Sequence, residues 1–221
     1  MRCITIIPAS GTGSRFESKI PKQFYKIEGD EILIHTLKKF ECVSEITEII
    51  IATKNIFFKK IENLLKKHSF SKKYKIVQGG KRRQDSVYSA LKACECNEND
   101  IILVHDAVRP YLTVKLIKKL IRNAKKYKAV IPVLNIDDTI KKIKNNFVEN
   151  TIPRSDLKRA QTPQAFEFGI LFNAFRAAYE NNIYATDESS IVENYGYPVS
   201  IIEGEEANIK ITKKENIREY I

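Results

Sequence analysis

The chain has 221 residues, of which 43% are hydrophobic and 29% charged, and 38 lysines and arginines against 27 acidic residues give a formal net charge of +11. This composition supplies enough apolar side chains for a folded core and excludes wholesale disorder. No apolar run approaches the ~20 residues needed to span a bilayer, and Met1-Arg2 leads directly into a strand-like stretch rather than a signal peptide, so we expect a soluble, cytoplasmic protein with one domain over residues 1–221.

The positive charge fits a phosphorylated or polyanionic ligand, although lysines occur in every segment and a general compositional drift explains much of the excess. A nucleic-acid-binding protein is the alternative that the charge alone suggests. It is disfavoured because the charges are dispersed rather than arranged in a basic stripe between exposed aromatic side chains. The four cysteines lack metal-ligand spacing and are interpreted as reduced and mostly buried: Cys3, Cys42, Cys94 and Cys96.

Short β-branched runs alternate with segments of helical period over the first 133 residues. The runs predict buried strands at residues 4–7, 46–52, 76–77, 101–104 and 129–133. The helical segments are residues 34–41, 56–67, 87–94 and 116–121. This order predicts an α/β fold with a mostly parallel sheet, helices on both faces, and a ligand at the carboxyl ends of the strands.

A β-hairpin arm is predicted at about residues 136–155. Residues 137–144 and 147–152 alternate in polarity and are separated by Asn145-Asn146, a turn signal. The hairpin is basic and has little to bury, so we expect it to lie against something else, such as another subunit. Beyond it, the patterns predict helices at 168–179 and 187–195, strands at 199–202 and 208–211, and a last helix from residue 213.

The first strand runs into a glycine-rich turn, Pro8-Ala9-Ser10-Gly11-Thr12-Gly13-Ser14-Arg15-Phe16. Two glycines in such a turn let backbone N–H groups converge on an anion. Phe16 stands where a dinucleotide-binding fingerprint has its third glycine, and the Gly-Lys-Ser/Thr of a Walker loop is missing. Arg15 and Lys22 add two cations that suit a polyphosphate whose charge grows during transfer. The alternative is a tight turn beside two solvated basic side chains.

A carboxylate follows the fourth strand in the segment His105-Asp106-Ala107-Val108-Arg109-Pro110. Asp106 is well placed to hold Mg²⁺ against a polyphosphate, and Arg109 to bind a second anionic group. Asp106 and Arg109 are alternatively a local ion pair that closes the strand. His105 is interpreted as a buried core histidine rather than a base.

The third strand leads into Gly79-Gly80-Lys81-Arg82-Arg83-Gln84-Asp85-Ser86. The glycines allow a flat ligand to approach the backbone, and Ser86 offers a hydroxyl near a helix N-terminus. The alternative interpretation makes Ser86 a helix-start residue and residues 81–83 a solvated basic run.

Seven motifs occur in order along nearly the whole chain, and together they resemble the 2-C-methyl-D-erythritol 4-phosphate cytidylyltransferase family within the wider group of sugar-phosphate cytidylyltransferases. The motifs are Ala9-Ser10-Gly11-Thr12-Gly13-Ser14-Arg15, Pro21-Lys22-Gln23-Phe24, residues 80–87, residues 105–110, Thr162-Pro163-Gln164-Ala165-Phe166, Thr186-Asp187-Glu188-Ser189 and Asn208-Ile209-Lys210-Ile211-Thr212. The resemblance implies a Rossmann-like domain whose β-arm forms a homodimer. It also implies that CTP and methylerythritol 4-phosphate react, with Mg²⁺, to a CDP-linked alcohol and pyrophosphate.

The resemblance also implies roles for individual residues. Arg15, Lys22, Asp106 and Lys210 would be catalytic, with Asp106 near the metal and the ribose. The nucleotide-binding residues would be Ala9, Ser10, Gly11, Thr12, Gly13, Gly80, Arg83, Ser86 and Ala107. The residues that bind the acceptor phosphate would be Arg109, Thr186 and Lys210, together with Thr139 and Arg154 on the arm, the latter from the second subunit.

Two positions depart from the family pattern. Ser10 adds a hydroxyl where alanine is usual, and Lys81 replaces an acidic or small residue. A ribitol 5-phosphate cytidylyltransferase, which shares the glycine-rich loop, is the alternative within the group. Residues 83–87 and 186–189 look more like the erythritol branch. The nucleophile would be a phosphate oxygen that is already ionised, so the lack of a convincing Ser/His/Asp set is expected.

Overall fold

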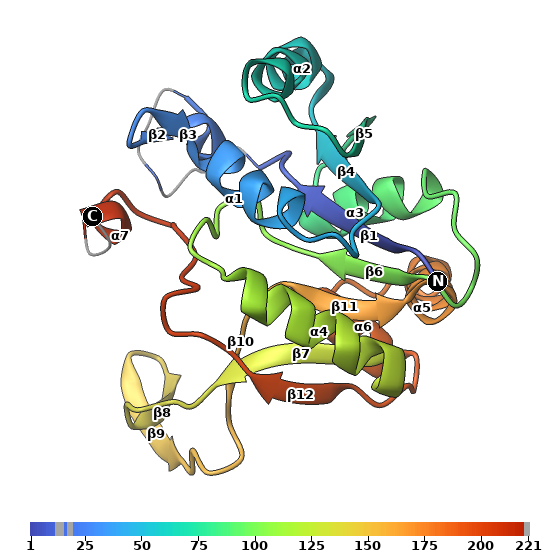
Figure 1. Ribbon diagram of the computed structural model, residues 1–221. Helices are drawn as coiled ribbons and strands as arrows, with labels where there is room; N and C mark the ends of the chain where they lie inside the picture. Colours follow the sequence, from blue (N-terminus) through green and yellow to red (C-terminus); the bar gives the residue numbers. More distant parts are fainter. Residues whose placement is uncertain (12–15, 17–19, 219–221) are drawn as a thin grey trace.

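An eight-stranded sheet forms the centre of the molecule (Figure 1). The structure is a computed structural model that describes residues 1–11, 16 and 20–218. The strands run in the order β10-β7-β11-β6-β1-β4-β5, and β12 also pairs with β7. Their bounds are β1 Cys3–Pro8, β4 Glu48–Thr53, β5 Lys73–Gln78, β6 Ile101–Val104, β7 Ala129–Leu134, β10 Arg159–Ala160, β11 Gln164–Glu167 and β12 Ser200–Glu203.

The sheet is mostly parallel, as predicted. The pairs β1–β4, β1–β6, β4–β5 and β7–β12 are parallel, whereas β11 lies antiparallel between β6 and β7. The runs of Ile, Leu and Val in β1, β4 and β6 fit this position because both faces of these strands are buried. Their carboxyl ends therefore meet at one edge of the sheet, where the predicted motifs follow.

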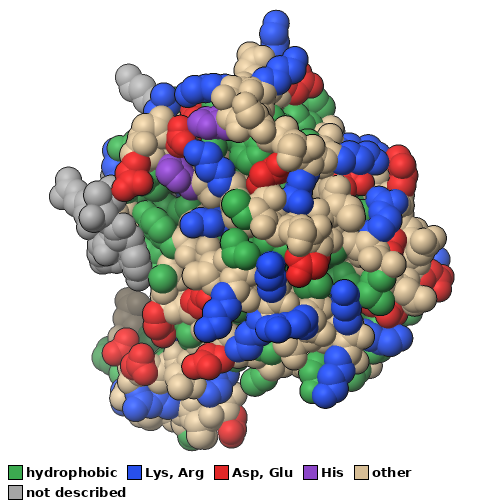
Figure 2. Space-filling view, in the orientation of Figure 1, with side chains coloured by type: hydrophobic (Ala, Val, Ile, Leu, Met, Phe, Trp, Pro, Cys, Tyr) green, Lys and Arg blue, Asp and Glu red, His purple; other side chains and the backbone are tan. Residues whose placement is uncertain are grey.

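Helices cover both faces of the sheet, which confirms the predicted layers. One face packs on α1 (Ile32–Glu41), α2 (Phe58–Lys67) and α4 (Val114–Tyr127), and the other on α3 (Arg83–Lys92), α5 (Phe168–Glu180) and α6 (Glu188–Asn194). Alternate strand residues serve the two cores: Ile49 and Ile51 lie in the first, and Ile50 in the second. The outer face of α4 is basic, and its side chains gather on the surface over this helix (Figure 2). Among the helices of the described chain, none is long and apolar enough to cross a membrane.

Four short strands were not predicted: β2 (Lys26–Ile27), β3 (Asp30–Glu31), β10 and β11. The predicted strand at residues 208–211 is wrong, since no strand is formed there and the backbone N–H of Ile211 donates to the Val108 carbonyl at 2.9 Å. The predicted helix from residue 56 begins as a short 3-10 segment, η3 (Asn55–Phe57), and the last helix, α7, spans Glu215–Arg218.

The predicted hairpin is present and protrudes from the end of β7 (Figure 1). It pairs β8 (Ile140–Lys144) with β9 (Phe147–Ile152), and both turn residues, Asn145 and Asn146, have positive φ. Three of its apolar side chains are exposed: Ile143, Phe147 and Val148. We refer to residues 136–155 as the arm.

Candidate active site

A pocket of about 260 Å³ opens at the carboxyl ends of β1 and β6. It is lined by residues of five motifs that the sequence singled out, the last of them in the C-terminal segment. These lining residues are Pro8, Ala9, Ser10, Gly11, Lys22, Gln23, Gly80, Lys81, Arg82, Arg83, Ser86, Asp106, Ala107, Val108, Lys210 and Thr212. The structure thus brings together the predicted nucleotide-binding residues that it describes. Thr12, Gly13 and Arg15 lie outside the described residues.

The described start of the first glycine-rich loop, residues 8–11, is held by Gln23, whose role the sequence did not reveal. Its Nε2 donates to the carbonyl oxygens of Ala9 and Gly11, at 2.7 and 3.2 Å. Gln23 is buried in η2 (Lys22–Phe24), which follows Pro21. Because carbonyl oxygens repel phosphate, turning two of them onto Gln23 favours an anion at this loop.

The second glycine-rich loop packs against the first. A Cβ on Gly79 would collide with the Ser10 hydroxyl, so any larger residue there would force the Ser10 side chain to move. The backbone N–H of Gly80 donates to Ser86 Oγ, and this hydroxyl donates to the carbonyl of Arg82, both at 3.1 Å. Ser86 therefore holds the start of α3, as its alternative interpretation required, and also lines the pocket.

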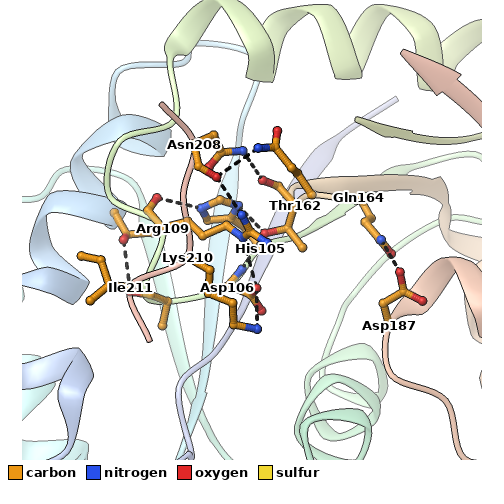
Figure 3. Close-up of polar contacts among 12 residues, drawn as sticks. His105, Asp106, Arg109, Thr162, Gln164, Asp187, Asn208, Lys210 and Ile211 are labelled. Carbon is orange, nitrogen blue, oxygen red and sulfur yellow. Dashed lines mark hydrogen bonds and ion pairs between the residues drawn. The ribbon is translucent and has the colours of Figure 1, made fainter. Parts of the chain in front are cut away.

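Asp106 lies at the centre of a cluster of cations (Figure 3). Arg83 Nε donates to Asp106 Oδ1 at 3.0 Å, and Oδ2 lies 3.3 Å from Arg109 Nε and 3.0 Å from Lys210 Nζ. Burial opposes ionisation, but Arg83, Lys210 and Arg109 outweigh it and hold the pKa of Asp106 well below its usual range. The predicted local pair of Asp106 and Arg109 is present, and it is one part of this larger cluster. Asp106 is ionised and keeps the cations at the floor of the pocket.

Arg83 bridges two carboxylates, which the sequence did not indicate. Its Nη1 donates to Glu188 Oε1 at 2.6 Å, while its Nε contacts Asp106. The Glu188 side chain is 1% exposed. Residues 186–189 carried a family motif but no sign of this contact, because Glu188 lies far from Arg83 along the chain.

Lys210 lies in the C-terminal segment 208–211, which is held by side-chain contacts instead of by strand pairing. The carbonyl of Asn208 accepts from Arg109 Nη1 at 2.7 Å, and that of Ile211 accepts from Lys22 Nζ at 3.0 Å. Asn208 Nδ2 in turn donates to the Thr162 carbonyl at 2.8 Å. These side chains take up backbone acceptors that a strand would offer to a neighbour, which explains why residues 208–211 form no strand.

His105 is a buried core histidine, as predicted. Its Nδ1 lies 3.0 Å from Thr162 Oγ1 and its Nε2 lies 3.2 Å from the Arg109 carbonyl. Because that carbonyl can only accept, Nε2 carries the proton and Nδ1 accepts from Thr162. Burial lowers the pKa of His105 to about 3. The ring is therefore neutral near pH 7, and its one N–H proton, on Nε2, is donated to the Arg109 carbonyl.

The neutral state of His105 predicts a pH dependence of stability. The pKa of this side chain is 6.5 when it is exposed to water, as in the unfolded chain, and about 3 in the folded chain. The unfolded chain therefore binds the extra proton first, and stability falls as the pH drops from about 6.5 towards 3. Between pH 7 and 5 the free energy of unfolding should fall by about 2 kcal/mol more in the wild type than in His105→Gln, measured by urea unfolding. Equal pH dependences would contradict a buried neutral ring.

The predicted acceptor-binding residues are only partly assembled. Arg109 and Lys210 contact Asp106. Thr186 is exposed and precedes α6, while Thr139 and Arg154 are exposed on the arm, and none of these three is among the described residues that line the pocket. Within one chain, the structure thus gathers the nucleotide side of the predicted site but not the arm.

A mostly parallel α/β sheet, glycine-rich turns and a pocket lined by cations at the strand ends are typical of proteins that bind phosphorylated ligands. The sequence matches the model of the family IspD, 2-C-methyl-D-erythritol 4-phosphate cytidylyltransferase, over residues 3–219. The chain therefore belongs to this family, and it is a nucleotidyltransferase, as the resemblance predicted.

Similar proteins support this assignment. The 2-C-methyl-D-erythritol 4-phosphate cytidylyltransferase of Clostridioides difficile (strain 630) is 43% identical over 98% of this chain and 92% of its own length. That of Clostridium novyi (strain NT) is 39% identical over 96% and 92%. The crystal structure of the Francisella tularensis enzyme has a TM-score of 0.86 at 35% identity and covers 99% of this chain and 98% of that one. The predicted fold class is confirmed.

Proposed function

We propose that the chain joins CTP and 2-C-methyl-D-erythritol 4-phosphate to give 4-diphosphocytidyl-2-C-methyl-D-erythritol and pyrophosphate, a step of non-mevalonate isoprenoid biosynthesis. The family match over residues 3–219 supports the reaction. The cation cluster around Asp106 indicates where this reaction takes place. Both substrates are phosphorylated, and the pocket concentrates positive charge at the strand ends.

Catalysis would consist of positioning and charge neutralisation. The attacking phosphate oxygen is ionised at neutral pH, so no general base is needed, which agrees with the neutral His105. Lys22 and Lys210 approach the pocket from the N-terminal and C-terminal segments, where they would bind phosphate oxygens and stabilise the charge that develops on the α-phosphate. Arg15 would add a further cation.

The nucleotide side would bind as the sequence predicted. The backbone of Ala9, Ser10, Gly11, Thr12 and Gly13 would contact the triphosphate, and Gly80, Arg83, Ser86 and Ala107 would line the base and ribose. Arg109, Thr186 and Lys210 would hold the acceptor phosphate.

Mg²⁺ would bind at Asp106. Mg²⁺ accepts one or two carboxylates together with phosphate oxygens and water. In the described part of the chain, no group of three or more His, Cys, Asp or Glu side chains could hold a metal ion. Asp106 is ionised and lines the pocket, so it fits a metal whose other ligands would be phosphate oxygens and water, and Lys210 would exchange its contact with Asp106 for a phosphate. When bound, Mg²⁺ would neutralise charge on the leaving pyrophosphate.

Release of pyrophosphate tests the assignment. With methylerythritol 4-phosphate as acceptor, we expect release with CTP and little with ATP, GTP or UTP. Ribitol 5-phosphate in place of the acceptor should give little product with CTP. Preference for ribitol 5-phosphate would support the alternative acceptor, and absence of release with every nucleotide would overturn the proposed function.

We also propose a two-fold homodimer formed through the arm, in the cytoplasm, without nucleic acid or membrane as partner. Three exposed apolar side chains on the arm, Ile143, Phe147 and Val148, would be buried by a second copy. Arg154 and Thr139 would then complete the acceptor site of the partner subunit.

Mixing two variants tests the shared site. Lys22→Ala and Arg154→Ala should each be nearly inactive alone, yet regain some activity when their subunits exchange. One of the two hybrid sites then combines the arm of the Lys22 variant with the core of the Arg154 variant, so it has both residues intact. Exchange is followed with differently tagged chains, and each variant mixed with itself is the control. Demonstrated exchange without recovered activity would show that Arg154 does not act across the interface.

A further inference from the structure

Glu188 is a buried carboxylate at the edge of the site that no step described so far uses. It is the first residue of α6, directly after Asp187, whose side chain accepts from the backbone N–H of Ser190 at 3.1 Å. Asp187 also accepts from Gln164 Nε2 at 2.7 Å, and Gln164 comes from β11 in the centre of the sheet. The position of Glu188 is therefore set from both sides, by the helix and by the sheet.

The chain just before Glu188 is held against the start of α3 by contacts of residues 179 and 183–185. The Tyr179 hydroxyl donates to Asp85 Oδ1 at 2.6 Å, and Gln84 exchanges hydrogen bonds with the backbone of residues 183 and 185. The guanidinium of Arg82 lies 3.7 Å from the ring centroid of Tyr184. These contacts hold the two segments together without Glu188. The contact between Glu188 and Arg83 is therefore not needed to hold the two segments together.

That contact orients a planar group. Arg83 presents Nη1 to Glu188 at 2.6 Å and Nε to Asp106 at 3.0 Å, so two carboxylates fix one guanidinium through different nitrogens. Arg83 Nη2 and Glu188 Oε2 are buried, and each lacks a hydrogen-bond partner among the described residues. A pair that leaves two polar atoms unsatisfied contributes little to stability. The effect of this pair is therefore the orientation that it gives to the guanidinium of Arg83.

The charges around Asp106 also support an orienting role for Glu188. Arg83, Arg109 and Lys210 surround Asp106, and Glu188 is the second carboxylate of the cluster, where burial raises its pKa and Arg83 opposes that rise. Without Glu188, Arg83 would be free to turn towards the phosphates of a bound nucleotide, and Asp106 would lose the partner that fixes its Oδ1. We propose that Glu188 is a positioning residue that acts through Arg83 to hold Asp106 in its reactive orientation. This inference rests on the proposed function, because it assigns Asp106 to the nucleotide site.

The test is a double-mutant cycle on kcat with CTP. Glu188→Gln keeps the size of the side chain and removes its charge, and we expect kcat to fall by about tenfold or more, as for other groups that orient a metal-binding side chain. In an Arg83→Gln background the same substitution should change kcat by less than about threefold, because its target is gone. Single-turnover assays with excess enzyme keep large losses measurable.

Glu193→Gln is the matched control, since Glu193 lies exposed on the same helix, and its kcat should stay within about twofold of the wild type. Thermal unfolding of every variant checks the fold. If Glu188→Gln does not fold, Glu188→Asp replaces it, because a side chain shorter by one methylene cannot keep the 2.6 Å contact and should also lose kcat.

Two results would overturn the proposal: a folded Glu188 variant with the kcat of the wild type, or a loss that persists in the Arg83→Gln background and therefore does not pass through Arg83. Activity of the wild type with CTP is measured in the same series. Its absence would contradict the proposed function itself, whereas an active wild type makes the variants a test of Glu188 alone.

Discussion

Lys22→Ala is expected to lower kcat by about 10²-fold or more while the chain stays folded. Lys22 lines the pocket from η2, and its Nζ donates to the Ile211 carbonyl at 3.0 Å. This contact fixes the cation close to Lys210, so the charge is in place before the α-phosphate gains charge in the transition state. Steady-state kinetics with CTP and methylerythritol 4-phosphate measure the loss.

Lys67→Ala is the matched control for Lys22→Ala. Lys67 is exposed at the end of α2, so its removal changes the net charge equally but should leave kcat within about twofold. Lys22→Arg keeps the charge and should retain more activity than Lys22→Ala. A folded Lys22→Ala variant with nearly normal turnover would remove Lys22 from the catalytic site.

Asp106→Asn should lower kcat/KM by about 10²-fold and also destabilise the fold. The substitution keeps the shape of the side chain but removes the charge that three cations share, and an amide N–H₂ would face one of them. Removing one partner of a buried ion pair typically costs about 3–5 kcal/mol, because charge is left uncompensated. Here Arg83 keeps Glu188, so the lower end of that range is expected for the free energy of unfolding.

Both effects of Asp106→Asn are measurable on the same preparation, by urea unfolding and by pyrophosphate release. Glu62→Gln, on the exposed face of α2, removes one negative charge far from the pocket and should change neither. Asp106→Asn with unchanged stability and unchanged kcat/KM would show that the cations do not depend on this carboxylate.

The parallel part of the sheet could be predicted because the residue pattern of each strand indicates that both of its faces are buried. Apart from Thr5, residues 4–7 and 101–104 are apolar on both faces, and only a strand between two helical layers buries both. The edge strand β5 was predicted at 76–77 only, because Lys73 and Lys75 are tolerated at an exposed edge and interrupt the apolar run. The local pattern therefore predicted the central strands more accurately than the edge strand β5.

The antiparallel strand β11 could not be predicted in this way. Gln164–Glu167 is short and follows Pro163, and its position between β6 and β7 depends on partners distant in sequence. Residues 208–211 show the opposite error, since their alternation is typical of a strand. Side chains of Lys22 and Arg109 bind carbonyls of this segment instead. The local sequence pattern does not indicate which groups will form hydrogen bonds with the backbone N–H and C=O groups of a segment.

The candidate site was predictable residue by residue but not as a network. The glycines and Asp106 are recognisable from their places after strands, and the structure brings them to one pocket. Arg83 was interpreted as part of a basic run or as a nucleotide contact, and its bridge from Asp106 to Glu188 follows only from the fold, which brings the first residues of α3 and α6 together. A contact between residues so far apart in the chain leaves no spacing to recognise.

The base of the arm has a consequence for how this protein can change. Arg159 pairs with Leu134 and Ala160 with Val133, so the chain leaves and re-enters the sheet at neighbouring positions. Doubling the length of a loop closed in this way costs only about 0.6 kcal/mol. The length of the arm can thus change with little effect on the closure of the sheet. A lineage could replace the arm, and with it the proposed acceptor and subunit contacts, while the strands that present Asp106 keep their register.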